Sequence, residues 1–275
     1  MMTYKLNWFK LGTALMFGSL LFACQKLDKP SLPDNYPVDP DNPGGTLKFY
    51  TAFENTTVDS IKATFAATST ISYENGIRGR AMKGATGKYI SYGAANDVAK
   101  ATSLSVSLWI NTQKHDGGAQ GVFMLPREGD FWGNLFLMIE GNNGPTDSMF
   151  IKFHFAGQWA EFGGALRFPD MYGKWRHLVF TYDEATSKFA AYLDGVARTL
   201  PASMTDRKSG GNPLGKLVWN RPSKFIFGGF QQHLGSPWNA PEPWMLNYTG
   251  LLDQFRIYSK ALSPAEVKAL FDSKQ

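Results

Sequence analysis

Apolar and polar side chains alternate with a period of two along much of the chain that follows residue 46. The alternation is clearest in three stretches, Leu47–Phe53, Leu104–Ile110 and Met149–Phe155. Successive side chains of a strand point to opposite faces of a sheet, so each stretch is predicted to be a half-buried strand. Further strands are predicted at Leu135–Glu140, Trp175–Tyr182, Lys188–Leu193 and Phe225–Phe227. Many strands at this spacing favour an antiparallel β-sandwich.

One helix is predicted near the C-terminus. Ser263 is a typical N-cap residue, Pro264 takes the first helical position, and Glu266 completes a capping box. Apolar residues follow at helical spacing and form one short stripe: Val267, Leu270 and Phe271. We expect the helix to dock on the sandwich through this stripe.

The N-terminus has the form of a secretory signal. Lys5 and Lys10 precede the apolar run Leu11–Ala23, which is too short for a comfortable membrane span. The run ends at Cys24, the single cysteine of the chain. This arrangement resembles the lipobox of bacterial lipoproteins, in which the cysteine is lipidated and becomes the mature first residue. The alternative is an ordinary signal peptide with an incidental cysteine.

A proline-rich segment follows the cysteine. Residues 26–45 contain five prolines and two terminal glycines among acids and amides, so they bury little apolar area and are predicted to be an extended tether. The expected organisation is a signal peptide at 1–23, a lipidated cysteine and tether at 24–45, and one folded domain at 46–275. The expected location is the bacterial cell envelope, with the lipid in the outer membrane and other envelope proteins as further partners.

Composition and charge narrow the class of protein. The chain has 275 residues, of which 43% are hydrophobic, and this supports one large packed all-β domain. It carries 28 Lys and Arg against 23 Asp and Glu, with no dense basic cluster. Electrostatics therefore give no argument for nucleic acid as a partner. A single cysteine allows no disulfide within the chain, so stability must come from the core or from a bound metal.

The stretch Thr249–Phe271, "TGLLDQFRIYSKALSPAEVKALF", resembles the end of the laminin-G-like modules of the concanavalin A-like superfamily. Those modules end with G-x-I-D-E-x-R-I-Y-x-x-A-L-S-x-x-E-I, and Gln254 stands where the pattern has an acid. Three other stretches are similar to family strands in the same order: Leu104–Ile110, Gly173–Tyr182 and Phe189–Gly195. The resemblance implies an antiparallel jelly-roll β-sandwich of the concanavalin A-like type with a short C-terminal helix.

The resemblance leaves function open, because this fold carries lectins, adhesion modules, lyases and hydrolases. The glucanase branch uses two glutamates in an E-x-D-x-x-E strand, and this chain lacks that motif. Glu128-Gly129-Asp130 is the nearest approach and is predicted to lie in a loop. The four histidines show no metal-ligand spacing: His115, His154, His177 and His233. We therefore expect non-catalytic glycan binding. The alternatives are a protein-binding, adhesion or structural module, and a glycan-degrading enzyme whose site is assembled from separate strands.

Asp253 shares strand parity with Phe255 and Ile257, so its carboxylate is predicted to be buried and must have a partner. One alternative is hydrogen bonding from loop amides. The other is Ca²⁺, which related jelly rolls bind with acids of their first and last strands, and which takes hard oxygen ligands. Glu54 and Asp59 are the acids predicted to join Asp253 in such a calcium site.

Two tryptophans lie among three prolines in the stretch Ser236–Met245, "SPWNAPEPWM". Proline cannot donate a ladder hydrogen bond, so this stretch is predicted to be a rim loop that leads into the final strand. At least one indole is predicted to be a sugar-stacking platform, with Trp238 favoured over Trp244 because Asn239 is its neighbour. The alternative is that the rings fold inward. Asn239, His233 and Glu242 are predicted to bond the hydroxyls of the sugar, and Trp132 with Asn134 is predicted to form a second wall.

Overall fold

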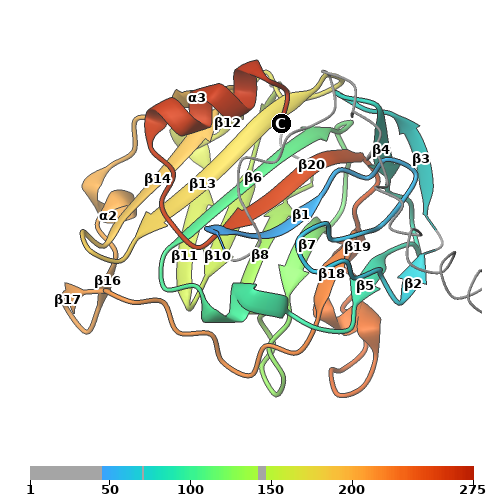
Figure 1. Ribbon diagram of the computed structural model, residues 1–275, viewed down its shortest axis with the longest axis horizontal. Coiled ribbons are helices and arrows are strands. Elements are labelled where there is room, and N and C mark those ends of the chain that lie inside the picture. Colours follow the sequence, from blue (N-terminus) through green and yellow to red (C-terminus); the bar gives the residue numbers. More distant parts are fainter. Residues whose placement is uncertain (1–44, 70, 142–146) are drawn as a thin grey trace, which may run out of the picture. The chain divides into compact units, whose positions relative to one another are not determined.

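Two mainly antiparallel sheets pack face to face in the computed structural model, which describes residues 45–69, 71–141 and 147–275 (Figure 1). The first sheet has the order β15 (Val196–Ala197), β14 (Lys188–Leu193), β13 (Arg176–Asp183), β6 (Leu104–Asn111), β20 (Leu251–Tyr258), β4 (Arg80–Lys83) and β3 (Ser72–Asn75), with β1 (Leu47–Thr51) also paired to β20. The second has the order β11 (Gln158–Phe162), β10 (Ile151–Phe155), β8 (Leu135–Ile139), β7 (Ala119–Leu125), β18 (Phe225–Phe227), β5 (Ile90–Tyr92) and β2 (Thr68–Ser69), with β19 (Met245–Asn247) parallel to β7.

Short elements connect and border these sheets. Two small ribbons pair β9 (Ser148–Met149) with β12 (Phe168–Pro169), and β16 (Lys208–Ser209) with β17 (Asn212–Pro213). The helical segments are η1 (Asn96–Lys100), η2 (Gly164–Leu166), α2 (Ala202–Thr205), η3 (Gln231–Leu234) and α3 (Pro264–Asp272). The architecture is the antiparallel jelly-roll sandwich with a short C-terminal helix that the sequence predicts.

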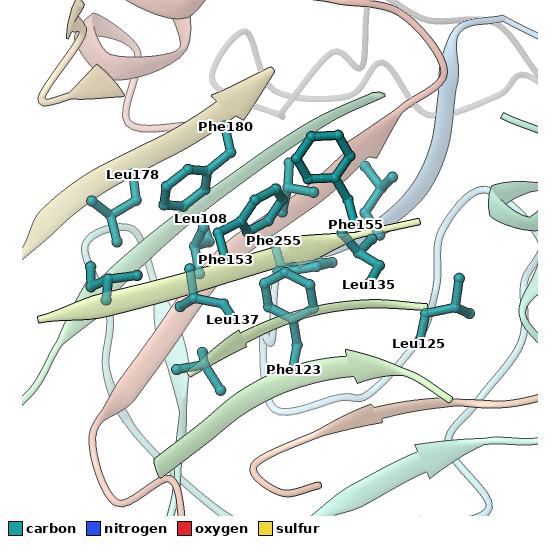
Figure 2. Packing of buried hydrophobic residues seen from close by; sticks show 14 of the residues in the cluster. Leu108, Phe123, Leu125, Leu135, Leu137, Phe153, Phe155, Leu178, Phe180 and Phe255 are labelled. Atoms are coloured by element: carbon teal, nitrogen blue, oxygen red, sulfur yellow. The ribbon is translucent and has the colours of Figure 1, made fainter. Parts of the chain in front are cut away.

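The main core lies between the two sheets and is rich in phenylalanine (Figure 2). Phe153 of β10 stacks on Phe180 of β13 with 4.4 Å between ring centroids, which joins the two sheets directly. Phe255 of β20 meets Phe123 of β7 edge-on at 4.9 Å. Such aromatic pairs add to the free energy gained from burial of their apolar area.

The strands with clear alternation are confirmed as strands, but they are buried on both faces and not half-buried, β6 at every position from Leu104 to Ile110. Two of them also differ in extent from the prediction. β1 stops at Thr51, because Phe53 has a left-handed backbone with φ of 56°. The stretch Met149–Phe155 divides at Phe150 into β9 and β10. β7 was not predicted because it carries apolar side chains on both faces, so its sequence does not alternate between polar and apolar positions.

The C-terminal helix α3 is also confirmed. The Ser263 side chain accepts a hydrogen bond from the Glu266 amide, and Glu266 Oε2 accepts one from the Ser263 amide. Figure 1 shows α3 lying across the end of the first sheet that holds β13 and β14. Val267 is fully buried there in a second cluster, together with Val179 and Tyr192. The helix therefore covers part of the outer face of the first sheet.

The second sheet is apolar on its outer face as well. Five residues of its strands are buried on this side: Ala119, Met124, Phe136, Met138 and Ile226. The segment between β18 and β19 supplies Phe230, and β19 supplies Met245, to cover them. This third cluster brings the proline-rich loop onto the sheet and sets the position of the candidate site.

Among the described residues, no helix has both the length and the apolar character needed to cross a membrane. The predicted signal peptide, Cys24 and the tether up to residue 44 lie outside the described residues.

Truncation of a ring in the main core should destabilise the fold strongly. Phe255 is fully buried against Phe49, Phe123 and Phe227, so Phe255→Ala should lower the free energy of unfolding by about 3–5 kcal/mol. Phe65→Ala is the matched control, because that ring is 67% exposed, and its change should stay within about 0.5 kcal/mol. Urea denaturation measures both. Equal effects would contradict the assignment of the core.

Candidate functional site

Four aromatic side chains meet on the outer side of the second sheet and form the aromatic patch: Phe131, Trp132, Trp159 and Trp244. Trp132 is the central ring. Its centroid lies 4.9 Å from that of Phe131 and 4.9 Å from that of Trp159, and both contacts are edge-on. The ring of Trp244 is tilted against Trp132 at 5.8 Å. Phe131 is 44% exposed and the three indoles are partly exposed, so the patch is an aromatic surface open to solvent.

A buried layer of rings supports the patch. Trp132 stacks on Phe136 of β8 at 5.5 Å, and Phe136 stacks in turn on His154 of β10 at 4.7 Å. His154 points outward from the sheet, as its strand parity predicts, but Trp159 covers it edge-on at 4.9 Å. Burial lowers the pKa of His154 to about 4, so at neutral pH the imidazole is an uncharged member of the stack.

Asn134 holds the loop that carries Trp132. Its side-chain Nδ2 donates to the carbonyls of Pro126 and Asn220, both at 2.9 Å, and its Oδ1 accepts from the Asn220 amide at 2.8 Å. A glycine is required at position 133, between Trp132 and Asn134. A Cβ there would lie 2.7 Å from Met124 Cγ and 2.8 Å from the carbonyl of Leu125. The loop is therefore packed tightly onto β7.

Two buried glutamines join the same loop to η3. Gln231 Nε2 donates to the carbonyls of Asp130 and Phe131 at 2.7 and 3.0 Å, and its Oε1 accepts from the Arg127 amide at 2.9 Å. Gln232 Nε2 donates to the Phe131 carbonyl at 2.8 Å. These bonds hold both edges of the loop, so the rings of the patch rest on fixed backbone.

The preference for Trp238 as the platform is wrong. The loop predicted at Ser236–Met245 is present up to Trp244, but it leads into β19, which begins at Met245, and not directly into the final strand β20. Within this loop, Trp238 is only 8% exposed. Its indole N–H donates to the carbonyl of Arg127 at 2.9 Å, which satisfies the polar edge of the ring inside the protein. Trp238 therefore packs inward, whereas Trp244 joins the patch.

Of the other predicted sugar-binding residues, some lie in or near the exposed surface and others are buried inside the protein. Trp132 lies in the patch, but Asn134 is 2% exposed and fully engaged in loop contacts, so it cannot be a wall of the site. His233 Nδ1 accepts from the Phe230 amide at 3.0 Å, and its ring packs beside Tyr89. Asn239 is exposed on the proline-rich loop next to the buried Trp238.

Sequence reasoning missed Phe131 and Trp159. Phe131 adjoins Trp132 in the same glycine-bordered loop, so that loop already carried a signal for it. Trp159 and Glu161 lie on one face of β11, while Ala160 and Phe162 are buried on the other. Recognising Trp159 would have required β11 to be identified first.

Asp253 is buried, as predicted, and accepts hydrogen bonds from loop amides. Its Oδ2 accepts from the Arg78 amide at 3.2 Å and its Oδ1 from the Gln254 amide at 2.7 Å. Glu54 Oε2 accepts from the Arg80 amide at 2.8 Å. The turn 76–80 thus lies against both carboxylates. Gly79 has a left-handed φ of 58°, and a Cβ on it would collide with the Glu54 carboxylate.

Asp59 belongs to a different arrangement. Its carboxylate accepts from the amides of Tyr50 and Ile61 at 3.2 and 3.1 Å, and from Asn96 Nδ2 at 2.8 Å. Within the ranges that the structure describes, no three His, Cys, Asp or Glu side chains form a group that could hold a metal ion. The predicted trio of Asp253, Glu54 and Asp59 therefore does not assemble, although the first two are neighbours.

His177 is a packed, hydrogen-bonded residue of the first sheet. Its Nε2 lies 2.8 Å from Ser107 Oγ, and its ring stacks on Trp109 at 4.9 Å. Burial lowers the pKa of His177 to about 3. Both His177 and Ser107 are 0% exposed, so a substrate has no access to them.

The family model Laminin_G_3, described as the concanavalin A-like lectin/glucanases superfamily, matches residues 84–268. The chain therefore belongs to this superfamily. No curated protein matches the sequence.

Several solved structures share the fold. Domain 4 of AbnA, a GH43 extracellular arabinanase from Geobacillus stearothermophilus solved in complex with arabinotriose, has 20% identity and a TM-score of 0.54, over 82% of this chain and 98% of that chain. Trypanosoma rangeli sialidase in complex with sialic acid has 16% identity and a TM-score of 0.54, over 83% and 33%. The binding domain of Paraclostridial Mosquitocidal Protein 1 has 17% identity and a TM-score of 0.55, over 83% and 52%. At these identities the likeness concerns the fold.

The Asp253 carboxyl should make stability depend on pH. Burial, with a smaller contribution from repulsion by Glu54, raises the pKa of Asp253 to about 7 from 3.8. Between these values the folded chain retains a proton on Asp253 that the unfolded chain has lost, so the contribution of Asp253 to stability should fall as pH rises from about 4 to 7. The buried, uncharged His154 and His177 contribute in the opposite direction, so the effect of Asp253 is the difference between the pH profiles of the wild type and Asp253→Asn. Asp253→Asn should remove the contribution of Asp253, measured by urea denaturation in a chelator. Identical pH slopes for the two proteins would contradict it.

Proposed function

We propose that the protein is a non-catalytic glycan-binding module, and that the aromatic patch is its binding surface. The observation that carries the proposal is the group of four partly exposed rings, of which Phe131 and Trp132 lie on a loop held by buried amide side chains. Contiguous exposed apolar surface marks an interaction site more often than chance packing. Membership of a superfamily of lectins and glucanases makes a sugar the ligand class that fits this surface best.

The geometry of the rings suits a sugar. Trp132 and Trp159 are nearly perpendicular, with an interplanar angle of 88°, so the patch presents two surfaces at a corner. The apolar face of a pyranose or furanose can stack on one ring while its edge contacts the other. Fixed backbone lowers the ordering entropy that binding costs.

Binding without chemistry is proposed because the chain lacks the E-x-D-x-x-E strand of the glucanase branch, and because two acids on this side of the sandwich are ion-paired. Asp130 Oδ2 lies 3.3 Å from Arg127 Nη1, and Glu140 Oε1 lies 2.7 Å from Lys152 Nζ. Glycoside hydrolysis requires one carboxyl as acid and a second as nucleophile or base.

We further propose that the module is a lipoprotein of the bacterial envelope, lipidated at Cys24 and held off the membrane by residues 26–45. A tethered module of this kind would keep a glycan near the cell surface. Calcium remains a proposal for the turn 76–80. The carboxylates of Asp253 and Glu54 are the hard ligands that Ca²⁺ prefers, and the cation would relieve their mutual repulsion.

Loss of a patch ring should weaken glycan binding. We expect Trp244→Ala and Trp159→Ala each to lower affinity at least about tenfold, or about 1.4 kcal/mol. A glycan array selects the ligand, with arabinotriose included because a structural neighbour was solved with it. Calorimetric titration then measures affinity, with Phe65→Ala as the control for an exposed ring elsewhere. If both patch variants stay folded and bind as tightly as the wild type, the patch is not the site.

Substitution of the proposed lipidation residue should abolish membrane attachment. Cys24→Ser removes the thiol that would accept the lipid, so the variant should stay unprocessed or leave the membrane fraction. Fractionation and mass spectrometry of the mature N-terminus measure both. A Cys24→Ser protein that is processed and still partitions with membranes would rule out the anchor.

A further inference from the structure

A polar cavity of about 430 Å³ lies at the edge of the sandwich, where α2 and β16 meet the start of β11. Its walls are Gln158, Ala202, Ser203, Asp206, Arg207 and Lys208. Figure 1 shows α2 and β16 together at the left of the molecule. None of these residues belongs to the aromatic patch or to the turn at Asp253.

Arg207 forms the inner wall of this cavity and is 6% exposed. Its guanidinium lies over the rings of Phe189 at 4.7 Å and Phe155 at 5.6 Å. Nη1 donates to the carbonyl of Trp159 at 2.7 Å, whereas Nε and Nη2 have no hydrogen-bond partner among the described residues. A charged group with unsatisfied donors in such a position is costly, and a nearby anion would offset part of that cost.

The charges around the cavity do not balance. Asp206 is its single acid among the wall residues, and its Oδ1 is 2.5 Å from Lys188 Nζ and accepts from Thr205 Oγ1 at 2.9 Å. That ion pair neutralises Asp206, which leaves the charges of Arg207 and Lys208 uncompensated. Burial lowers the pKa of Arg207 to about 10, which still leaves it charged at neutral pH.

The cavity adjoins the aromatic patch through β11. Gln158 lines the cavity, and the next residue, Trp159, belongs to the patch. Successive side chains of a strand point to opposite faces, so Gln158 and Trp159 border the edge strand β11 from opposite faces, and the cavity and the patch meet around this edge of the sheet. The bond from Arg207 to the Trp159 carbonyl joins them directly.

We propose that this cavity is an oxyanion subsite, which takes the carboxylate or sulfate of an acidic sugar in the glycan that stacks on the aromatic patch. Lys208 and Ser203, both exposed on its wall, reach the anion directly, and Arg207 contributes its charge from behind. The part of this proposal that concerns the sugar rests on the proposed glycan-binding function. The part that concerns anion binding rests on the cavity alone. It makes the preferred glycan an acidic one.

The test is an NMR titration of the isotopically labelled folded domain with two small probes, inorganic sulfate and free galacturonate, at ionic strength held constant with chloride. Saturable shifts are expected at the Gln158 side chain and at the amides of residues 202–208, with a dissociation constant of about 1–10 mM. Sulfate and galacturonate together show which oxyanion is preferred. Lys208→Gln with Ser203→Ala should weaken binding at least fivefold, whereas Lys216→Gln, which removes an exposed charge outside the cavity, should not.

The outcomes separate the two proposals. Saturable binding at the cavity that persists in Trp244→Ala supports the subsite independently of the patch. If neither probe produces saturable shifts there, or if Lys208→Gln with Ser203→Ala binds as tightly as the wild type, the subsite is refuted even when the patch binds a neutral glycan. Shifts spread over all surface lysines would refute it as well.

Discussion

The apolar outer face of the second sheet is the constraint on which the candidate site depends. β7, β8 and β18 bury apolar side chains on both faces, so this sheet cannot be left against water. Phe230 and Met245 cover its middle, but the segment between them is interrupted by proline and cannot pair as a strand. The cover is therefore incomplete. The indoles of Trp132, Trp159 and Trp244 pack over the rest of the sheet, and part of each ring remains exposed to solvent. The aromatic patch is the exposed margin of a core.

The aromatic patch differs from an incidental hydrophobic surface because hydrogen bonds hold the backbone that carries its rings. The buried side-chain amide of Asn134 bonds to backbone groups of Pro126 and Asn220, and that of Gln231 bonds to the carbonyls of Asp130 and Phe131. Hydrogen bonds inside the protein are strong when geometry is fixed and expensive to leave unmade, so the loop has one favoured conformation. A ligand that stacks on Trp132 meets a ring already in place. Arg207 has the same role for Trp159, whose carbonyl it binds from the core side.

The sequence predicted the elements whose signal is local. The alternation in β6 and β10 and the capping box of α3 all depend on neighbouring residues, and each was placed within a residue or two. β7 was not predicted because it carries apolar side chains on both faces, which removes the alternation that marks a strand. The site was harder to predict, because contacts between residues far apart in the chain decide which rings are exposed. The sequence favoured Trp238 over Trp244 only through its neighbour Asn239, whereas the Trp238 indole is buried and bonded to the carbonyl of Arg127, 111 residues earlier in the chain.

Partners far away in the sequence also determine which hydrogen bonds the acidic side chains accept. Asp253 could be predicted to need a partner, but the turn that supplies the Arg78 amide lies 175 residues away and has no sequence signature of its own. Asp59 looked equivalent to Glu54 in the sequence, yet its carboxylate is occupied by Tyr50, Ile61 and Asn96. Parity within a strand predicts burial, whereas the identity of the partner depends on how the strands are assembled.

The central claim, that the aromatic patch binds a glycan, is tested most directly by the indole N–H resonances of the seven tryptophans that follow Cys24, during titration with an array-selected oligosaccharide. The patch indoles Trp132, Trp159 and Trp244 should shift together and saturate with one affinity. Trp109, Trp219 and Trp238 should stay fixed, because their N–H groups are bonded to backbone carbonyls inside the fold. Saturable binding that leaves the three patch resonances unmoved would contradict the account.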